Sequence, residues 1–204
     1  KVNYCRMTKL APITTGVPPP LIGKAGALSG AVILIGDRSD APASAMRSAL
    51  LREAATVIWR RSMRDVTEKI EAGGLALVLL DMDLPGGDPI DLVRRIRFGE
   101  LGDNPFVPIM MTSVRREGQV ILAALLAGVD DVLAKPVSPV LVSRRIQRLA
   151  VARKPFVAAS DYIGPVRAHM AHSLQRAKQF EPPNALKAAI LGQSLTGDGV
   201  NPEF

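Results

Sequence analysis

The sequence predicts a doubly wound α/β fold, in which a five-stranded parallel sheet carries helices on both faces. Two observations predict it. Residues 75–80 form an unbroken apolar run, which is typical of a strand buried on both faces of a parallel sheet. Between residues 31 and 154, short apolar runs alternate strictly with stretches of helical spacing. This order calls for parallel strands joined by right-handed crossovers.

Five strand–helix pairs account for this central region. The expected strands cover about residues 32–35, 56–59, 75–80, 106–112 and 129–134. The expected helices cover about residues 40–54, 63–72, 88–98, 115–127 and 138–152. Pro42 and Pro139 lie near the first turn of their helices, where a missing N–H costs little. Gly73-Gly74 closes the second helix.

The helix expected at residues 88–98 illustrates the spacing. Its apolar positions fall on one side, and Arg94, Arg95 and Arg97 are expected to face water. These arginines, with Arg144, Arg145 and Arg148, could meet anionic partners, but a solvated helix face is the simpler interpretation.

The two flanking regions lack this regularity. Residues 1–30 are rich in proline and glycine and predict a flexible or polyproline-like leader. In residues 155–204, a turn at 161–165 precedes helical stretches at about 166–179 and 185–191. This tail is too small to bury a core of its own, so it either packs on the central domain of residues 31–154 or stays mobile.

Composition narrows the class of protein. The net charge of +7 includes 18 basic and 15 acidic residues at positions 31–154, so the central domain carries only +3 and gives little reason to expect direct DNA binding. No apolar run approaches the roughly 20 residues that a membrane span needs. Cys5 has no partner for an internal disulfide, which favours a reducing cytoplasm.

Reactive side chains end four of the expected strands. Asp37 follows the first strand, Asp81 ends the third, Thr112-Ser113 ends the fourth and Lys135 follows the fifth. The carboxyl ends of parallel strands converge on one edge of a sheet, where such folds bind ligands. Together these groups suit a phosphoryl group: a carboxylate accepts it, and a divalent cation, an amine and a hydroxyl hold its oxygens. From position alone, Asp81 could instead simply cap the next helix.

Three segments resemble the receiver domains of two-component response regulators, which have the flavodoxin-like chemotaxis-type fold. They are VLLDMDLPGGDPIDLVRRIR, PIMMTSV and AGVDDVLAKPV, and the resemblance covers about residues 31–154. It implies that Asp81 is the phosphoacceptor, that Lys135 binds the phosphate and that the Lys135–Pro136 bond is cis. In this family a hydroxyl at the end of the fourth strand, the switch hydroxyl, moves on phosphorylation. The resemblance favours Ser113 for this role, with Thr112 as the alternative.

The same resemblance implies Mg²⁺ held by Asp37, Asp81 and the backbone carbonyl of Asp83. The family usually has two adjacent acids after the first strand, whereas this chain has Gly36-Asp37-Arg38. If Asp37 matches the second acid, the direct ligand is kept; if it matches the first, Arg38 replaces that ligand. Matching VILI to the usual apolar run favours the former. The lost carboxylate should weaken Mg²⁺ binding, and Arg38 could supply charge that makes the metal dispensable.

A further departure is Val132, where the family usually has an aromatic residue that turns inward when the hydroxyl moves.

The expected function is acceptance of a phosphoryl group on Asp81 from a sensor histidine kinase or phosphotransfer protein, without turnover as an enzyme. Output would come from contact with a partner protein or from homodimerisation. The alternative is an atypical receiver that is never phosphorylated and acts as a constitutive interaction module. A flavin or nucleotide enzyme is disfavoured, because no glycine-rich loop follows the first strand.

Other conspicuous residues have simpler interpretations. His169 and His172 could ligate a metal, but a solvated face is the simpler interpretation, since no third ligand is near in sequence. Trp59 and Met110-Met111 are expected to serve packing. In the tail, DYIGP and FEPPNALKA are similar to extensions of some bacterial stand-alone receivers.

Overall fold

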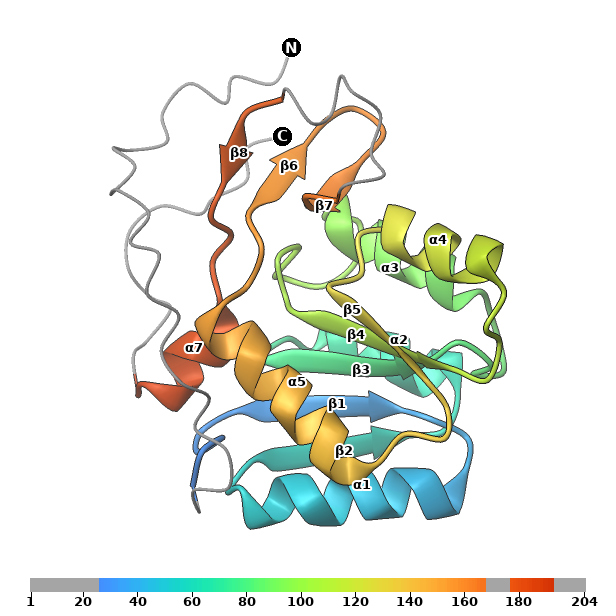
Figure 1. Cartoon of the computed structure of the whole chain (residues 1–204), viewed down its shortest axis with the longest axis vertical. Coiled ribbons are helices and arrows are strands. Elements are labelled where there is room, and N and C mark those ends of the chain that lie inside the picture. The colour runs from blue at the N-terminus through green and yellow to red at the C-terminus, as the bar shows by residue number, and fades with distance from the viewer. Residues whose placement is uncertain (1–25, 168–176, 193–204) are drawn as a thin grey trace.

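The computed structural model describes residues 26–167 and 177–192. Its main feature is a parallel sheet of five strands in the order β2-β1-β3-β4-β5, with helices on both faces (Figure 1). This arrangement confirms the predicted fold class. The strands are β1 (Val32–Gly36), β2 (Thr56–Arg60), β3 (Leu77–Asp81), β4 (Ile109–Ser113) and β5 (Asp131–Ala134). The helices are α1 (Asp40–Arg52), α2 (Met63–Glu71), α3 (Pro89–Arg97), α4 (Gly118–Leu126) and α5 (Pro139–Val151).

The sheet separates two apolar cores. Val78 and Leu80 of β3 face α2, α3 and α4, whereas Leu77 and Leu79 face α1 and α5. All four side chains are buried, which explains why this strand shows no polar alternation. Met110 and Met111 of β4 likewise divide between the two cores, as expected for packing residues.

Local polar chemistry sets several element boundaries. Ser62, Asp88 and Ser138 each accept a hydrogen bond at the start of α2, α3 and α5. β4 begins at residue 109 rather than 106, because the Asn104 side chain accepts from the N–H of Phe106 and holds a turn there. α4 begins at residue 118 rather than 115, since the N–H of Arg115 is bound to Ser113 Oγ in a loop.

Ordered structure begins inside the segment expected to be a leader. Residues 26–30 form a turn, the Leu28 side chain is fully buried in the core under α1 and α5, and its N–H donates to the carbonyl of Glu53. The leader was expected to extend to residue 30 because glycines at 26 and 30 suggested flexibility. Here Gly26 and Gly30 have positive φ values and shape the turn instead.

The described part of the tail packs on the central domain, the first of the two alternatives that the sequence left open. It forms a three-stranded antiparallel sheet, β7-β6-β8, from β6 (Phe156–Ala158), β7 (Ile163–Pro165) and β8 (Gln179–Phe180), followed by α7 (Ala185–Ile190). The predicted short helix corresponds to α7. Residue 179, predicted to end a helix, instead begins β8, and most of the helix predicted at 166–179, with His169 and His172, lies outside the described residues.

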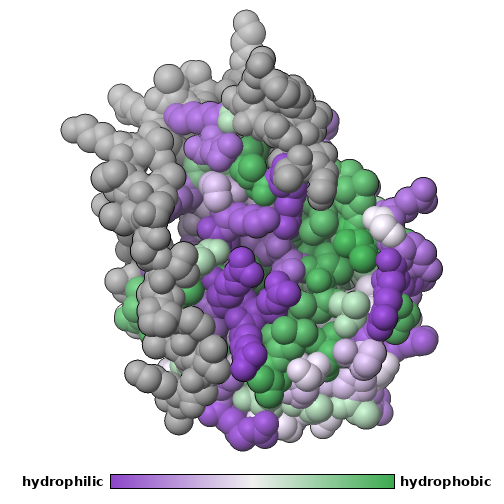
Figure 2. Space-filling model, viewed as in Figure 1, coloured by the Kyte–Doolittle hydropathy of each residue, from purple (hydrophilic) through white to green (hydrophobic). Residues whose placement is uncertain are grey.

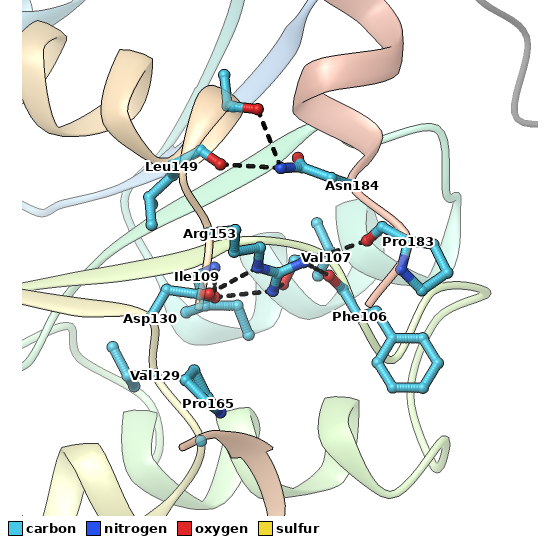
Figure 3. Close-up of polar contacts among 12 residues, drawn as sticks. Phe106, Val107, Ile109, Val129, Asp130, Leu149, Arg153, Pro165, Pro183 and Asn184 are labelled. Atoms are coloured by element: carbon cyan, nitrogen blue, oxygen red, sulfur yellow. Dashed lines mark hydrogen bonds and ion pairs between the residues drawn. The ribbon is translucent and has the colours of Figure 1, made fainter. Parts of the chain in front are cut away.

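A buried ionic cluster, here called the Asp130 cluster, consists of Arg97, Asp130 and Arg153. Figure 3 shows how Arg153 connects Asp130 to the carbonyl of Pro183 in the tail. Arg153 donates to Asp130 Oδ1 (2.7 Å) and Oδ2 (3.0 Å) and to the carbonyls of Phe106 and Pro183. The prediction that Arg97 faces water is wrong. Its side chain is fully buried and donates to Asp130 (3.0 Å) and to three backbone carbonyls, those of Pro105, Val107 and Gly128.

Aromatic packing closes the same junction. The Phe156 ring lies 5.4 Å from the guanidinium of Arg97 and 4.5 Å from that of Arg153, and it meets Phe106 and Phe180 edge to face. Since Asp130 precedes β5 and Val107 precedes β4, the junction lies at the amino ends of these strands. The described part of the tail, residues 155–167 and 177–192, therefore contacts the domain away from the carboxyl ends of these strands.

Candidate functional site

The carboxyl ends of the strands bring the predicted site residues to one edge of the sheet. Asp37 directly follows β1, Asp81 is the last residue of β3, Ser113 is the last residue of β4 and Lys135 directly follows β5. Asp81 lies beside Thr112 in the sheet register, and Ser113 beside Ala134. Asp37, Asp81 and both hydroxyl residues are buried, so their polar atoms depend on one another or on a ligand.

Lys135 connects the two acids. Its Nζ lies 3.0 Å from Asp37 Oδ2 and 2.9 Å from Asp81 Oδ2. Burial lowers the pKa of the Lys135 amine, but the hydrogen bonds and charges of Asp81 and Asp37 outweigh burial and raise the pKa above its ordinary value of 10.5. The amine is therefore a stable cation at neutral pH. The Lys135–Pro136 bond is cis, as the family resemblance implied.

One acceptor at this edge has no donor among the described residues. Asp37 Oδ1 accepts from the N–H of Ser39 at 2.8 Å, whereas Asp81 Oδ1 is buried and no described residue donates to it. Two carboxylates share one ammonium, so the group retains a net negative charge. Desolvating an anionic oxygen without a partner costs free energy, which a bound cation or phosphoryl group would recover. The residues present thus fit a hard divalent cation bound through oxygen.

The third metal ligand cannot be a further acidic side chain of the described region. Among residues 26–167 and 177–192, no group of three His, Cys, Asp or Glu side chains could hold a metal. The Asp83 carboxylate instead pairs with Arg115 at 2.8 Å. Asp83 could therefore contribute only its backbone carbonyl, as the sequence resemblance implied.

Ser113 and Thr112 remain the two candidates for the switch hydroxyl. Ser113 Oγ accepts the N–H of Arg115 at 2.9 Å, so it is linked to the loop that leads into α4. The backbone carbonyl of Thr112 accepts from Met82 at 2.9 Å and continues the sheet beyond Asp81. A displaced Ser113 side chain would release the Arg115 amide, and this link favours Ser113 as the residue that couples the site to α4.

The sequence analysis did not predict three residues that contact the loops of this site. Trp59, expected to serve packing, donates its indole N–H to the carbonyl of Asp37 at 2.7 Å and so fixes the loop after β1. Arg115 pairs with Asp83, and Arg116 donates to the carbonyl of Lys135 at 3.1 Å. The available signal was the Arg115-Arg116 pair directly after the strand-end hydroxyl, since loops at this edge supply ligand contacts.

The departures from the family pattern also have structural counterparts. Asp37 contacts the same amine as Asp81, which places it, rather than Arg38, at the ligand edge. Arg38 is exposed and forms no ion pair with any described residue. A Cβ at Gly36 would approach Val66 Cγ2 and Leu80 Cδ1 to 2.9 Å, so apolar side chains occupy the space of the usual outer acid. Val132 is half-buried against α4 and its neighbours.

A doubly wound sheet that gathers acids, a hydroxyl and a lysine at its carboxyl edge defines a receiver-type signalling domain. Residues 32–147 match the family model described as the response regulator receiver domain, and the chain belongs to this family. The central domain is therefore a receiver of the two-component type, as the three sequence segments suggested.

Relatives extend this finding. The chain is 28% identical over 162 residues to the swarming motility regulation protein RssB of Serratia marcescens, covering 69% of this chain and 70% of that protein. It is 31% identical over 121 residues to the KDP operon transcriptional regulatory protein KdpE of Escherichia coli, covering 56% of this chain but only 52% of that protein. The chain thus spans about half the length of some curated relatives.

Solved structures agree on the fold. A putative response regulator from Chloroflexus aurantiacus superposes with a TM-score of 0.54 at 26% identity, covering 61% of this chain and all of that one. The receiver domain of the sensor histidine kinase PA1611 from Pseudomonas aeruginosa, described with a magnesium ion in its active-site cleft, superposes with a TM-score of 0.52 at 24% identity, covering 59% of this chain and 96% of that one.

Proposed function

We propose that Asp81 accepts a phosphoryl group from the phosphohistidine of a sensor histidine kinase or phosphotransfer protein. The observation that supports this most strongly is the asymmetry of the Asp81 carboxylate. Its Oδ2 is held by Lys135 at 2.9 Å, while its Oδ1 is buried and accepts no hydrogen bond from residues 26–167 or 177–192. One oxygen is oriented and the other is available as a nucleophile.

The step forms a P–O bond to Asp81 and breaks the P–N bond of the donor, whose imidazole leaves with the bonding electrons. Negative charge gathers on the phosphoryl oxygens, where the Lys135 ammonium stabilises it. Ser113 donates its hydroxyl to the same oxygens, which costs it the contact with the Arg115 amide. The added charge thereby releases the Arg115 amide and changes the loop before α4.

Magnesium, when bound, would neutralise charge shared by the carboxylates and the phosphoryl group. Asp37, Asp81 and the carbonyl of Asp83 would hold it. The magnesium described for the PA1611 receiver supports this assignment. With Gly36 in place of an outer acid, we expect weaker magnesium binding than in receivers with the full acidic pair.

Output in this proposal is contact between proteins, in the cytoplasm, without turnover of a substrate. α4 exposes two large apolar side chains: Leu122 and Leu126 are 40% and 42% accessible. Val140 and Leu141 at the start of α5 are also exposed. Because Ser113 is linked to α4, the face made by α4, β5 and α5 would carry the signal to a partner protein or to a second copy of the chain. Within the described residues, no helix has the length and apolarity needed to cross a membrane.

Intact-mass analysis after incubation with acetyl phosphate and Mg²⁺ tests this function. The wild-type chain should gain the mass of one phosphoryl group, and Asp81→Asn should gain none. Asp83→Asn is the matched control, because only its backbone carbonyl is assigned a role, and it should still form the adduct. If no adduct forms under any condition with acetyl phosphate or phosphohistidine donors, the alternative of a constitutive interaction module replaces this proposal.

A further inference from the structure

The loop between β1 and α1 carries Asp37 to the carboxyl edge of the sheet. It consists of residues 37–39, since β1 ends at Gly36 and α1 begins at Asp40. Figure 2, in the same view as Figure 1, shows hydrophilic side chains at the edge toward which the strands point. Arg38, in the middle of the loop, is exposed. A loop beside solvent holds a side chain in one place only where its backbone is tied to the rest of the fold.

The neighbouring strand β2 ties both polar groups of the Asp37 backbone. The N–H of Asp37 donates to the carbonyl of Arg60 at 3.1 Å, and its carbonyl accepts from the indole N–H of Trp59 at 2.7 Å. The carboxylate is held separately, by the N–H of Ser39 at 2.8 Å and by Lys135 Nζ at 3.0 Å. Of these four bonds, the one from Trp59 comes from a side chain of β2, so it can be removed without altering the sheet.

The Trp59 ring is itself held in place. It is half-buried and packs against the core under α1 and α5. The guanidinium of Arg61 lies 4.6 Å from the ring and pairs with Asp40, the first residue of α1. Both ends of the loop are thus joined to β2. The ion pair of Arg61 and Asp40 is exposed and contributes little, so the bond from Trp59 to Asp37 provides most of this restraint.

Gly36 explains why this restraint matters in this chain. The side on which a Cβ of residue 36 would lie is filled by Val66 and Leu80, so Asp37 has no acidic neighbour there. A hard cation is attracted by the charge and number of its oxygen ligands, and one carboxylate fewer lowers that attraction. Affinity then depends more on how little freedom the remaining ligands lose on binding. A fixed Asp37 backbone reduces that loss.

We propose that Trp59 is a positioning residue for the metal site. Its indole N–H holds the backbone of Asp37, so that the carboxylate of this residue is already oriented for Mg²⁺. The inference rests on the proposed function, because it takes Asp37 as a ligand of Mg²⁺. Trp59 touches neither the cation nor the phosphoryl group and acts through Asp37.

Isothermal titration calorimetry of the full chain with Mg²⁺ tests this role. The chain contains a single tryptophan, so expression in a tryptophan auxotroph supplied with 3-benzothienylalanine replaces Trp59 alone. This analogue keeps the fused rings and has sulfur in place of the N–H. The dissociation constant for Mg²⁺ should rise about three- to tenfold, the effect of one lost hydrogen bond. Trp59→Phe should raise it at least as much.

Val57→Ala is the matched control for a loss of packing. Val57 lies two residues before Trp59 on the same face of β2 and packs against the same core. This variant should be less stable in urea denaturation, yet it keeps the indole N–H and should bind Mg²⁺ as the wild type does. An unchanged dissociation constant in the analogue-containing chain, or an equal increase in Val57→Ala, would overturn the proposal.

Phosphorylation by acetyl phosphate separates this role from the proposed function. At Mg²⁺ concentrations below the wild-type dissociation constant, the analogue-containing chain should form the adduct about three- to tenfold more slowly. At saturating Mg²⁺ it should reach the wild-type rate, and a rate that stays low would overturn the role of Trp59. Altered Mg²⁺ binding without an adduct in either chain would reject the proposed function but keep that role. Adducts in both chains with equal Mg²⁺ binding would do the reverse.

Discussion

The receiver sheet carries a buried ionic cluster at each end, and the two are built in opposite ways. At the carboxyl edge, one ammonium from Lys135 serves the two acids Asp37 and Asp81. At the amino end, the single acid Asp130 serves the two guanidiniums of Arg97 and Arg153. Both clusters are desolvated, so a difference in hydrogen bonding between them has energetic consequences.

The difference is that both carboxylate oxygens of Asp130 have hydrogen-bond partners, whereas only one oxygen of Asp81 has one among the described residues. Asp130 Oδ1 accepts from Arg153, and Oδ2 accepts from Arg97, Arg153 and the N–H of Ile109. Arg97 places its remaining donors on three backbone carbonyls. Asp81 Oδ1, by contrast, has no hydrogen-bond partner in the part of the chain that the structure describes. A buried network with every group satisfied fixes a structure, whereas one lacking a partner is prepared for a ligand. We therefore expect the Asp130 cluster to stabilise the fold, and the carboxyl edge to bind a ligand.

The largest predicted effect is at the amino end. Asp130→Asn removes the acid that pairs with two buried arginines, and breaking such a pair should lower the free energy of unfolding by about 3–5 kcal/mol. Urea denaturation followed by circular dichroism measures it. Asp131→Asn is the neighbouring control; its partly exposed pair with Arg145 should contribute at most about 1 kcal/mol. Equal losses in the two variants would show that the Asp130 cluster is not structural.

At the carboxyl edge the two partners should behave unequally. Lys135→Met leaves two neighbouring carboxylates without a counter-charge and should cost about 3 kcal/mol of stability. Asp81→Asn leaves one acid with one ammonium and should change stability by less than about 1 kcal/mol, even though it removes the proposed phosphoacceptor. The same urea experiment compares them. A loss in Asp81→Asn as large as that in Lys135→Met would contradict the view that the site is short of positive charge.

Restoring an acid at position 36 should be destabilising. In Gly36→Asp the new Cβ would meet Val66 and Leu80 at 2.9 Å, and the carboxylate would enter an apolar core, so we expect a loss of about 1–3 kcal/mol. Gly118→Asp is the control, because nothing lies within 4 Å of a Cβ at this first residue of α4. Thermal unfolding of the two variants gives the answer, and an undiminished melting temperature in Gly36→Asp would refute the steric argument.

Alkaline pH should weaken the carboxyl edge. The pKa of Lys135 is raised above 10.5, so its stabilising effect is fully present below pH 10.5 and is lost as the pH rises through the higher folded value. Burial also raises the pKa of Tyr162 from 10.0 to about 12, and its contribution is lost over that interval. Urea unfolding between about pH 9 and pH 12 in a Tyr162→Phe background removes the tyrosine contribution, while Arg97 and Lys154, whose pKa values are lowered, still titrate there. Lys135→Met in that background should lose less stability with rising pH than its parent does; a slope equal to that of its parent would exclude Lys135 as a source.

The smallest effect should be kinetic. Arg115→Ala removes a partly exposed cation beside Asp83 and should slow phosphorylation by acetyl phosphate about two- to fivefold, since an anionic donor is no longer attracted. The difference should shrink as salt is added. Time courses of adduct formation measure it, with Arg94→Ala as the control. Faster phosphorylation of Arg115→Ala would mean that the arginine shields the site instead.

The sequence was sufficient for the central fold because that fold depends on local patterns. The unbroken apolar run before Asp81 and the regular strand–helix alternation required a covered parallel sheet, and strand ends then located Asp37, Asp81, Ser113 and Lys135. The structure added two facts that positions in the sequence could not give. The Lys135 amine binds both Asp37 and Asp81, and no described residue donates a hydrogen bond to Asp81 Oδ1.

What the sequence did not predict depends on contacts between distant residues. Arg97 has the spacing of a solvent-facing residue, and its burial follows only from Gly128, Asp130 and the 105–107 loop, which the fold brings to it. β6 is three residues long and pairs with β7 and β8, so no periodicity could reveal it. Trp59 offered an indole N–H whose acceptor, the carbonyl of Asp37, lies 22 positions away.

The most direct test is a crystal structure of the full chain with beryllofluoride and Mg²⁺, compared with the untreated protein. The account predicts beryllium bound to Asp81, Lys135 Nζ and Ser113 Oγ within hydrogen-bond distance of its fluorides, and unchanged contacts among Arg97, Asp130 and Arg153. An untouched Asp81 at saturating reagent, or a rearranged Asp130 cluster with an unaltered carboxyl edge, would contradict it.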